Sequence, residues 1–217
     1  MFIKINRENS IVLLIILSHL AGIFGILWKP SSAFFLFLIP FHLLFMLVLG
    51  ILSWDKKDRL FWGYLIGLYF LGFFIEFLGV KTGKIFGIYT YGPSLGWQFF
   101  GIPLVIGINW ILLSFSSWTL VQEIPSIKSS PFWIKSILGG ILMTLLDLII
   151  EPVAIHFQFW NWAGGKIPLQ NYLAWFIFSF FIQWVLNKKF SYRKNIAFLV
   201  LYISQVIFFL ALNLSIT

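Results

Sequence analysis

The stretch Leu145–Trp175, LLDLIIEPVAIHFQFWNWAGGKIPLQNYLAW, decides how the chain can fold. It begins as an apolar helix that carries two carboxylates, Asp147 and Glu151. The helix is expected to break at Pro152, and the chain then passes through a loop rich in Trp and Gly before re-entering an apolar helix at Asn171. Acidic side chains are costly inside a bilayer and usually face a protein interior, so this pair indicates a functional site.

An earlier stretch, Phe74–Trp110, has the same layout. Glu76 lies near the end of an apolar helix, a loop punctuated by Gly and Tyr follows, and a new helix begins. Gly72 and Gly79 fall on the helical face of Glu76 and would allow a second helix to approach closely. We therefore predict that the two stretches meet and form one site.

The composition indicates a membrane protein. The chain has 217 residues, of which 60% are hydrophobic and 10% charged, whereas soluble domains carry about 25% charged residues. Its apolar runs are continuous rather than alternating, which disfavours an outer-membrane barrel. The predicted fold class is all-α, a polytopic membrane helix bundle formed by a single domain over residues 1–217. Because the chain has no Cys, it offers neither a disulfide framework nor a thiol nucleophile.

The net charge of +8 does not indicate a nucleic-acid partner, because the basic residues occupy loops between apolar runs. The first apolar run follows a basic N-terminus, is long, and lacks a small-residue cleavage site. We interpret it as a retained helix rather than a removed signal peptide.

A membrane-spanning helix needs about 20 mostly apolar residues. On this criterion we predict seven spans, over residues 10–28, 33–53, 60–80, 100–121, 132–151, 171–187 and 196–216.

The basic residues predict an orientation with the N-terminus inside and the C-terminus outside. In that orientation 11 of the 15 Lys and Arg residues are cytoplasmic, namely Lys4, Arg7, Lys56, Lys57, Arg59, Lys128, Lys135, Lys188, Lys189, Arg193 and Lys194. The other four are Lys29, Lys81, Lys84 and Lys166. Both long loops, 81–99 and 152–170, then lie on the outer face, close to all three acids.

Asp147 and Glu151 are four residues apart and so share one face of a helix. Two carboxylates in an apolar setting do not easily ionise together, so one of them can hold a proton for general-acid chemistry. A structural interpretation is also open, in which Glu151 sits at the membrane interface and Asp147 bonds to a neighbouring helix. For Glu151 alone we favour neither the functional nor the structural interpretation. For the pair together with Glu76 we favour function, since the three acids lie at one side.

Other polar side chains are weaker candidates. The loop aromatics are also typical of an interfacial aromatic belt, although such a belt needs no glycines at fixed turns. Buried amides such as Asn109 and Gln183 more often link helices than catalyse. We expect His19 and His42 to be interhelical hydrogen-bond partners, which leaves His156 as the one plausible proton shuttle. The three His residues show no clustered spacing, so no metal site is predicted.

The two stretches resemble the integral-membrane carotenoid biosynthesis family that contains the carotenoid 1,2-hydratases and bisanhydrobacterioruberin hydratase. The resemblance covers about half the chain. Its first part is Glu76-x-x-Gly79-x-x-Thr82-Gly83-x-x-Phe86-Gly87-x-Tyr89-x-Tyr91, followed by Gly101-x-Pro103 and Trp110. Its second part is Asp147-x-x-x-Glu151-Pro152-x-Ala154, then Trp160-x-Trp162, then Pro168-x-x-Asn171-Tyr172-x-x-Trp175. Lys166 and Ala174 stand where a glycine is frequent in the family, which bears on the loop geometry and the substrate end-group.

The resemblance implies addition of water across the terminal C1–C2 double bond of an acyclic carotenoid ψ-end, giving a tertiary alcohol. It implies no cofactor, a polyene substrate within the bilayer, and other carotenoid-pathway enzymes as a further class of partner. For localisation we assume a bacterial-type cell, in which the protein would lie in the cell (inner or cytoplasmic) membrane. Asp147 and Glu151 would then donate the proton, and Glu76 would position the water or take its proton. The expected substrate-binding residues are Tyr89, Tyr91, Trp110, Trp160, Trp162 and Asn171.

Three alternatives remain open at this point. A proton-initiated carotenoid cyclase of the lycopene type would use the same acid and aromatic groups but exclude water. A small transporter or proton channel would use the acids as a relay across the membrane, although the clustering of the acids at one side argues against it. A carotenoid-binding scaffold would carry out no chemistry.

Overall fold

A computed structural model of the chain describes residues 6–192 and 194–216, and most of these are helical. The α-helices are α1 (Arg7–Leu27), α2 (Lys29–Phe37), α3 (Ile39–Ser53), α4 (Arg59–Thr82), α5 (Ile106–Glu123), α6 (Phe132–His156), α7 (Leu169–Lys189) and α8 (Ile196–Ile216). The short strands are β1 (Tyr89–Tyr91), β2 (Gln98–Phe99), β3 (Ile102–Pro103) and β4 (Trp160–Trp162).

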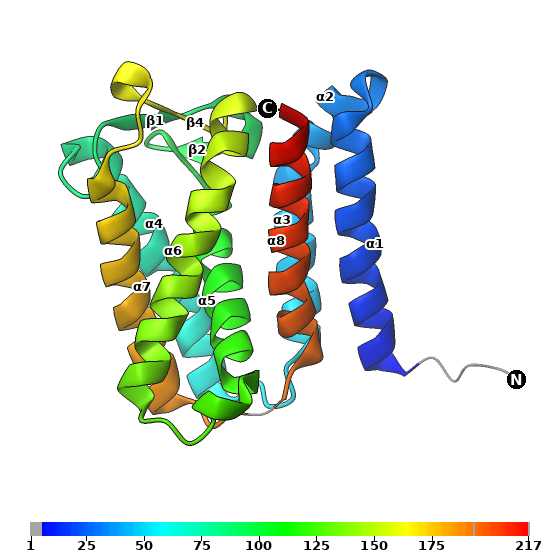
Figure 1. The fold of residues 1–217 in the computed structure, drawn as a ribbon, viewed down its shortest axis with the longest axis vertical. Helices are drawn as coiled ribbons and strands as arrows, with labels where there is room; N and C mark the ends of the chain where they lie inside the picture. Colours follow the sequence, from blue (N-terminus) through cyan, green and yellow to red (C-terminus); the bar gives the residue numbers. More distant parts are fainter. Residues whose placement is uncertain (1–5, 193, 217) are drawn as a thin grey trace, which may run out of the picture.

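The long helices run roughly side by side and form a bundle (Figure 1). The helices α1, α3 and α8 lie on one side of it and α4, α6 and α7 on the other, with α6 and α7 packed closely together. The strands and their loops gather at one end, where α8 also ends, whereas α1 begins at the opposite end. The two acid-bearing stretches therefore share one end of the bundle.

Among residues 6–192 and 194–216, five helices are long and apolar enough to cross a membrane by length and composition, namely α1, α4, α6, α7 and α8. A sixth crossing results if α2 and α3, which bend by 58° at their junction, are taken as one span. The chain is thus a multi-pass helical membrane protein. The bend corrects the straight span predicted over 33–53. Pro40 in the first turn of α3 supplies its physical reason, because proline cannot donate the backbone bond that would continue α2.

Helix α5 differs from the other long helices because protein surrounds it. It packs against α3, α4, α6, α7 and α8, and 14 of its 18 residues are buried. Its buried Ser and Gln side chains bond within the protein, so its sequence need not match the lipid. It begins at Ile106 rather than at the predicted residue 100, because residues 98–103 form the β2–β3 hairpin instead.

The predicted break at Pro152 is wrong, since α6 continues through it to His156. Pro152 is exposed and lies close to the end of the helix. Its missing N–H leaves only the carbonyl of Leu148 without its usual partner, on an exposed part of the helix surface. The helix that follows begins at Leu169, two residues before the predicted Asn171.

The described basic residues that the sequence assigns to the cytoplasmic side gather at one end of the bundle. The connections between α3 and α4, between α5 and α6 and between α7 and α8 all lie at the end where α1 begins (Figure 1). Nine of the eleven residues assigned to the cytoplasmic side belong to this end or its helix termini. The other two, Lys4 and Arg193, lie outside the described residues.

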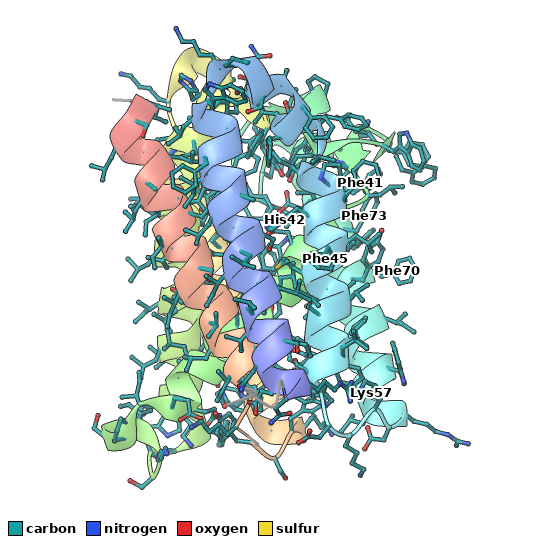
Figure 2. All side chains as sticks on the ribbon, turned by 90° about the vertical axis from the view of Figure 1, so that its right-hand side faces the viewer. Phe41, His42, Phe45, Lys57, Phe70 and Phe73 are labelled. Carbon is teal, nitrogen blue, oxygen red and sulfur yellow. The ribbon has the colours of Figure 1, made fainter. Side chains whose placement is uncertain are left out.

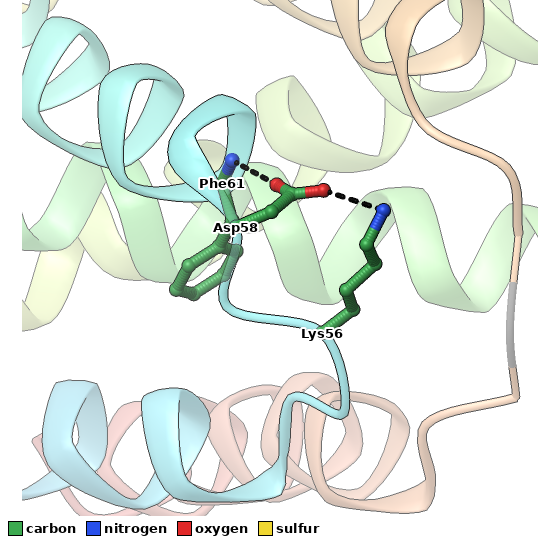
Figure 3. A network of polar contacts seen from close by, with 3 residues as sticks. All are labelled: Lys56, Asp58 and Phe61. Carbon is green, nitrogen blue, oxygen red and sulfur yellow. Dashed lines mark hydrogen bonds and ion pairs between the residues drawn. The ribbon is translucent and has the colours of Figure 1, made fainter.

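At this same end, Asp58 caps the start of α4 (Figure 3). Its carboxylate accepts a hydrogen bond from the backbone N–H of Phe61 at 3.0 Å and forms an ion pair with Lys56 at 2.9 Å. The backbone hydrogen bond, followed by the bond from Lys56, lowers the pKa of Asp58. The cap fixes where the helix that carries Glu76 begins.

Candidate active site

Strands β1 and β4 join the two acid-bearing stretches directly. They pair antiparallel, with Tyr89 opposite Trp162 and Tyr91 opposite Trp160. Side chains two residues apart on a strand point to the same face. All four aromatic rings therefore share one face of the ribbon, whereas Thr90 and Asn161 are exposed. The ring centroids of Tyr89 and Trp162 are 5.0 Å apart, and those of Tyr91 and Trp160 are 6.1 Å apart.

Glu76 is buried beneath this ribbon and accepts three hydrogen bonds. The hydroxyls of Tyr89 and Tyr91 donate to its Oε2 at 2.5 and 2.8 Å. The indole of Trp110 donates to its Oε1 at 3.1 Å. All three partners are donors, and an ionised carboxylate is an acceptor only. The surroundings of Glu76 therefore fit a carboxylate better than a carboxylic acid.

The two tyrosines are held as neutral donors. Burial, followed by the nearby charge of Glu76, raises the pKa of both Tyr89 and Tyr91 well above the usual range. A phenol that resists ionisation keeps its O–H available for the carboxylate. The β1 strand thus supplies two fixed donors to one buried acid.

Asp147 and Glu151 lie one turn apart on α6, and both are 2% exposed. The indoles of Trp160 and Trp162 donate to Glu151 Oε2 at 3.0 and 2.9 Å. The Asn171 amide bridges the two acids, donating to Asp147 Oδ2 at 3.0 Å and to Glu151 Oε1 at 3.3 Å. Glu151 therefore has three donors, whereas Asp147 has one.

The three acids and the six predicted substrate-binding residues all line one small cavity of about 30 Å³. Its lining also includes Phe86, Ile106, Asn109 and Trp175, which the sequence did not single out as site residues. Trp175 stacks on Trp110 with centroids 4.3 Å apart and rings 4° from parallel. The signals available for it were its place in the motif that ends Asn171-Tyr172-x-x-Trp175 and its position one turn after Asn171.

Gly72 permits the close approach of a second helix that the sequence predicts, whereas Gly79 packs against Phe86 in the loop after α4. A Cβ added to Gly72 would lie 2.6 Å from Cγ of Trp110, and one added to Gly79 would lie 2.6 Å from Cδ2 of Phe86. Such separations do not occur between real side chains, so both residues must stay small. Gly72 in particular lets Trp110 reach Glu76.

The predicted proton shuttle is wrong, because His156 is exposed at the end of α6 and does not line the cavity. His19 and His42 contact each other edge to face, with centroids 4.8 Å apart, in a separate part of the bundle. Gln183 links helices as expected, donating from α7 to the carbonyl of Ser114 and the hydroxyl of Ser117 on α5. Over residues 6–192 and 194–216, no group of three His, Asp or Glu residues is placed to hold a metal ion.

Comparison with known proteins identifies the family to which the chain is related. A family model described as carotenoid biosynthesis protein matches residues 34–217. The bisanhydrobacterioruberin hydratase of Haloarcula japonica is 27% identical over 117 residues, which are 52% of this chain and 40% of that protein. The chain thus spans less than half the length of this curated relative. No solved structure matches the chain.

Proposed function

Because the chain belongs to the carotenoid biosynthesis protein family, we propose that it is an enzyme that adds water to the terminal C1–C2 double bond of an acyclic carotenoid ψ-end. The observation that carries this proposal is the cavity itself, in which three buried carboxylates face a set of aromatic rings. Family membership supports a carotenoid as substrate, and the distant relation to a named hydratase supports hydration. The rest of the proposal is a mechanism for these side chains.

Asp147 delivers the proton in this mechanism. It is buried beside a second carboxylate, and its one hydrogen-bond donor comes from Asn171. Few donors and an apolar setting favour the protonated form of a carboxyl group. Transfer of this proton to C2 of the alkene forms a C–H bond and leaves a tertiary carbocation at C1. Glu151 and Asp147 share the proton as a pair, with Asn171 fixing both side chains.

Water then attacks C1, and its surplus proton leaves to a carboxylate. Glu76 is the proposed acceptor, because its three donors fit the ionised form. One proton is added to carbon and one is released from water, so the acids are unchanged after the proton returns to the pair. No electrons are exchanged with a second reagent, so the reaction needs no redox cofactor.

The aromatic rings stabilise the carbocation. Ring faces attract positive charge, most strongly where water is excluded. Tyr89, Tyr91, Trp160 and Trp162 form this wall, and the stacked Trp110 and Trp175 form another. A cavity of about 30 Å³ has room for one or two water molecules, since a single water needs about 10–15 Å³. This supports hydration over cyclisation, in which water would have to be kept out.

In the membrane we propose seven crossings, with α2 and α3 forming one span and the protein-covered α5 forming another. The N-terminus lies inside, the C-terminus lies outside, and the membrane is the cytoplasmic membrane of a bacterial-type cell. The excess of basic residues at one end of the bundle supports this orientation. The acids then lie near the outer ends of α4 and α6.

Expression in a lycopene-producing host tests the function. We expect a more polar pigment whose mass exceeds that of lycopene by one or two waters, depending on whether one or both ends react. An isomeric product of unchanged mass would instead identify a cyclase. If the host accumulates only unaltered acyclic and monocyclic carotenes, the hydratase proposal is wrong.

A further inference from the structure

A second cavity lies between α1, α3 and α8, and its volume is about 390 Å³. This falls within the range of about 300–1,000 Å³ that is usual for pockets that hold small organic ligands. Its walls are mostly aliphatic and aromatic side chains, including Ile26, Leu43 and Phe208. We call it the apolar cavity, and the 30 Å³ space around the acids the acid cavity.

The two cavities share part of their walls. Ile106, Asn109 and Trp160 line both of them. Ile150, which lines the apolar cavity, is followed directly by Glu151, which lines the acid cavity. A molecule bound in the apolar cavity would therefore place one end beside the carboxylates.

The apolar cavity is bordered by side chains on the lipid-facing surface of the bundle. Phe41 and Phe45 on α3 line it and are 56% and 39% exposed, and Ala21 on α1 lines it and is exposed as well. Figure 2 shows Phe41, His42 and Phe45 where α3 faces α1, with His42 between the two helices. A hydrocarbon dissolved in the bilayer could enter here without passing through water.

We propose that the apolar cavity is the arm of the active site that binds the isoprenoid chain next to the reacting double bond, and that the substrate enters it sideways from the bilayer between α1 and α3. This inference rests on the proposed function, since it assigns the ligand as an acyclic isoprenoid hydrocarbon. The acid cavity is too small for the whole isoprenoid chain, so the chain behind the reacting carbons must lie in a larger neighbouring space. Burial of its apolar surface favours binding there.

Polar side chains in this cavity suggest a competing use as a water path, namely Ser18, His19, His42, Asn109 and Gln205. His19 donates from Nδ1 to the carbonyl of Ile15 at 2.8 Å and contacts the ring of His42. Gln205 is 6% exposed, and its amide oxygen has no hydrogen-bond partner among the described residues. A water path would depend on these groups, whereas a hydrocarbon arm would not. Replacing them therefore separates the two uses.

A photo-crosslinking experiment tests the arm without relying on turnover. Benzoylphenylalanine is placed at Ala21, and in a control at Leu20, which is 41% exposed but does not line the cavity. Each protein is illuminated in nanodiscs that contain a low proportion of lycopene, and adducts are counted by mass spectrometry. We expect at least about tenfold more lycopene adduct at position 21. Equal yields at both positions would overturn the inference.

Kinetics give a second test. We expect Ala21→Trp to raise KM for lycopene about tenfold with little change in kcat, the pattern of lost substrate binding, and Leu20→Trp to match the wild type. Gln205→Leu makes the wall of the arm more apolar, so we expect it to lower KM for lycopene. A tenfold fall in kcat would instead overturn the arm in favour of a water path. The two proposals can fail separately. An excess of adducts at position 21 without any hydrated product would support the binding arm and refute the hydratase. Hydrated product together with equal adduct yields at positions 20 and 21 would support the hydratase and refute the binding arm.

Discussion

At the scale of single residues, the three buried acids differ chiefly in how many donors surround them. Glu76 and Glu151 each accept three hydrogen bonds from described residues, and Asp147 accepts one. A buried, ionised carboxylate needs such donors to replace its lost hydration, whereas a protonated carboxylic acid does not. The acids were predictable from the sequence because charged residues in apolar helices are conspicuous. The number of donors around each acid was not predictable, because it depends on loop and helix residues that are distant in the sequence.

We predict that Asp147→Asn lowers hydration at least about 100-fold, because a positioned general acid contributes about 10²–10⁴-fold to rate. The amide has nearly the same shape and cannot protonate an alkene. Turnover is measured by chromatography of the pigments, and the amount of protein in the membrane fraction is compared with the wild type. Normal turnover by this variant would remove Asp147 from the mechanism.

The two tyrosines give a pH prediction. Since their pKa values are raised above the ordinary value, which is about 10, the neutral network is fully stable below about pH 10 and loses stability as pH rises through the raised values. We therefore expect Tyr89 and Tyr91 not to contribute to the phenolate absorbance at about pH 11. The variant with both Tyr89→Phe and Tyr91→Phe should then show the same absorbance change as the wild type. A smaller absorbance change in the double variant than in the wild type would contradict this.

At the scale of elements, the helices were more predictable than the strands. Twenty-residue apolar runs identify helices, and all seven predicted spans coincide with helical segments to within a few residues, apart from the bend at Leu38 and the later start of α5. The β1–β4 pair is only three residues long on each side. The alternation in Tyr89–Tyr91 and Trp160–Trp162 was its sole local signal. Its partners are about 70 residues apart, and nothing in a single sequence specifies such a pairing.

The approach of α5 to α4 provides a prediction at this scale. Gly72→Ala should push the Trp110 ring away from Glu76, because the new Cβ would lie 2.6 Å from its Cγ. We expect a destabilisation of about 1–3 kcal/mol, as for other overpacked sites, together with reduced hydration. Thermal unfolding in detergent and pigment turnover measure the two effects.

Gly67→Ala on the same helix is the matched control, because a Cβ there meets nothing within 4 Å. It should be neutral or slightly stabilising, since Ala favours a helix more than Gly does. If both variants behave alike, the close contact between Gly72 and Trp110 does not hold the site together.

At the scale of the whole molecule, the distribution of basic residues in the sequence and the contacts in the structure both place the two long loops at the same end of the bundle. Basic residues in short loops predicted that the two long loops lie on one face. In the structure, strand pairing and backbone hydrogen bonds join those loops at one end of the bundle. The apolar cavity could not be predicted, since its walls combine α1, α3 and α8, whose sequences are mostly apolar, with residues from α5, α6 and the loops. Side-chain packing decides which faces of such helices contact each other, and the composition of the helices does not predict those faces.

The orientation of the whole bundle can be measured directly because the natural chain contains no Cys. Lys166 lies in the loop beside β4, at the end that holds the acids, and Lys128 lies at the opposite end, between α5 and α6. With the N-terminus inside, a membrane-impermeant maleimide should label Lys166→Cys in intact cells and should label Lys128→Cys only after the membrane is permeabilised. Both side chains are polar and outside the long helices, so neither substitution should disturb the fold, and turnover of each variant verifies this. The reverse labelling pattern would place the acids near the cytoplasmic face, so that the water consumed in hydration would come from the cytoplasm.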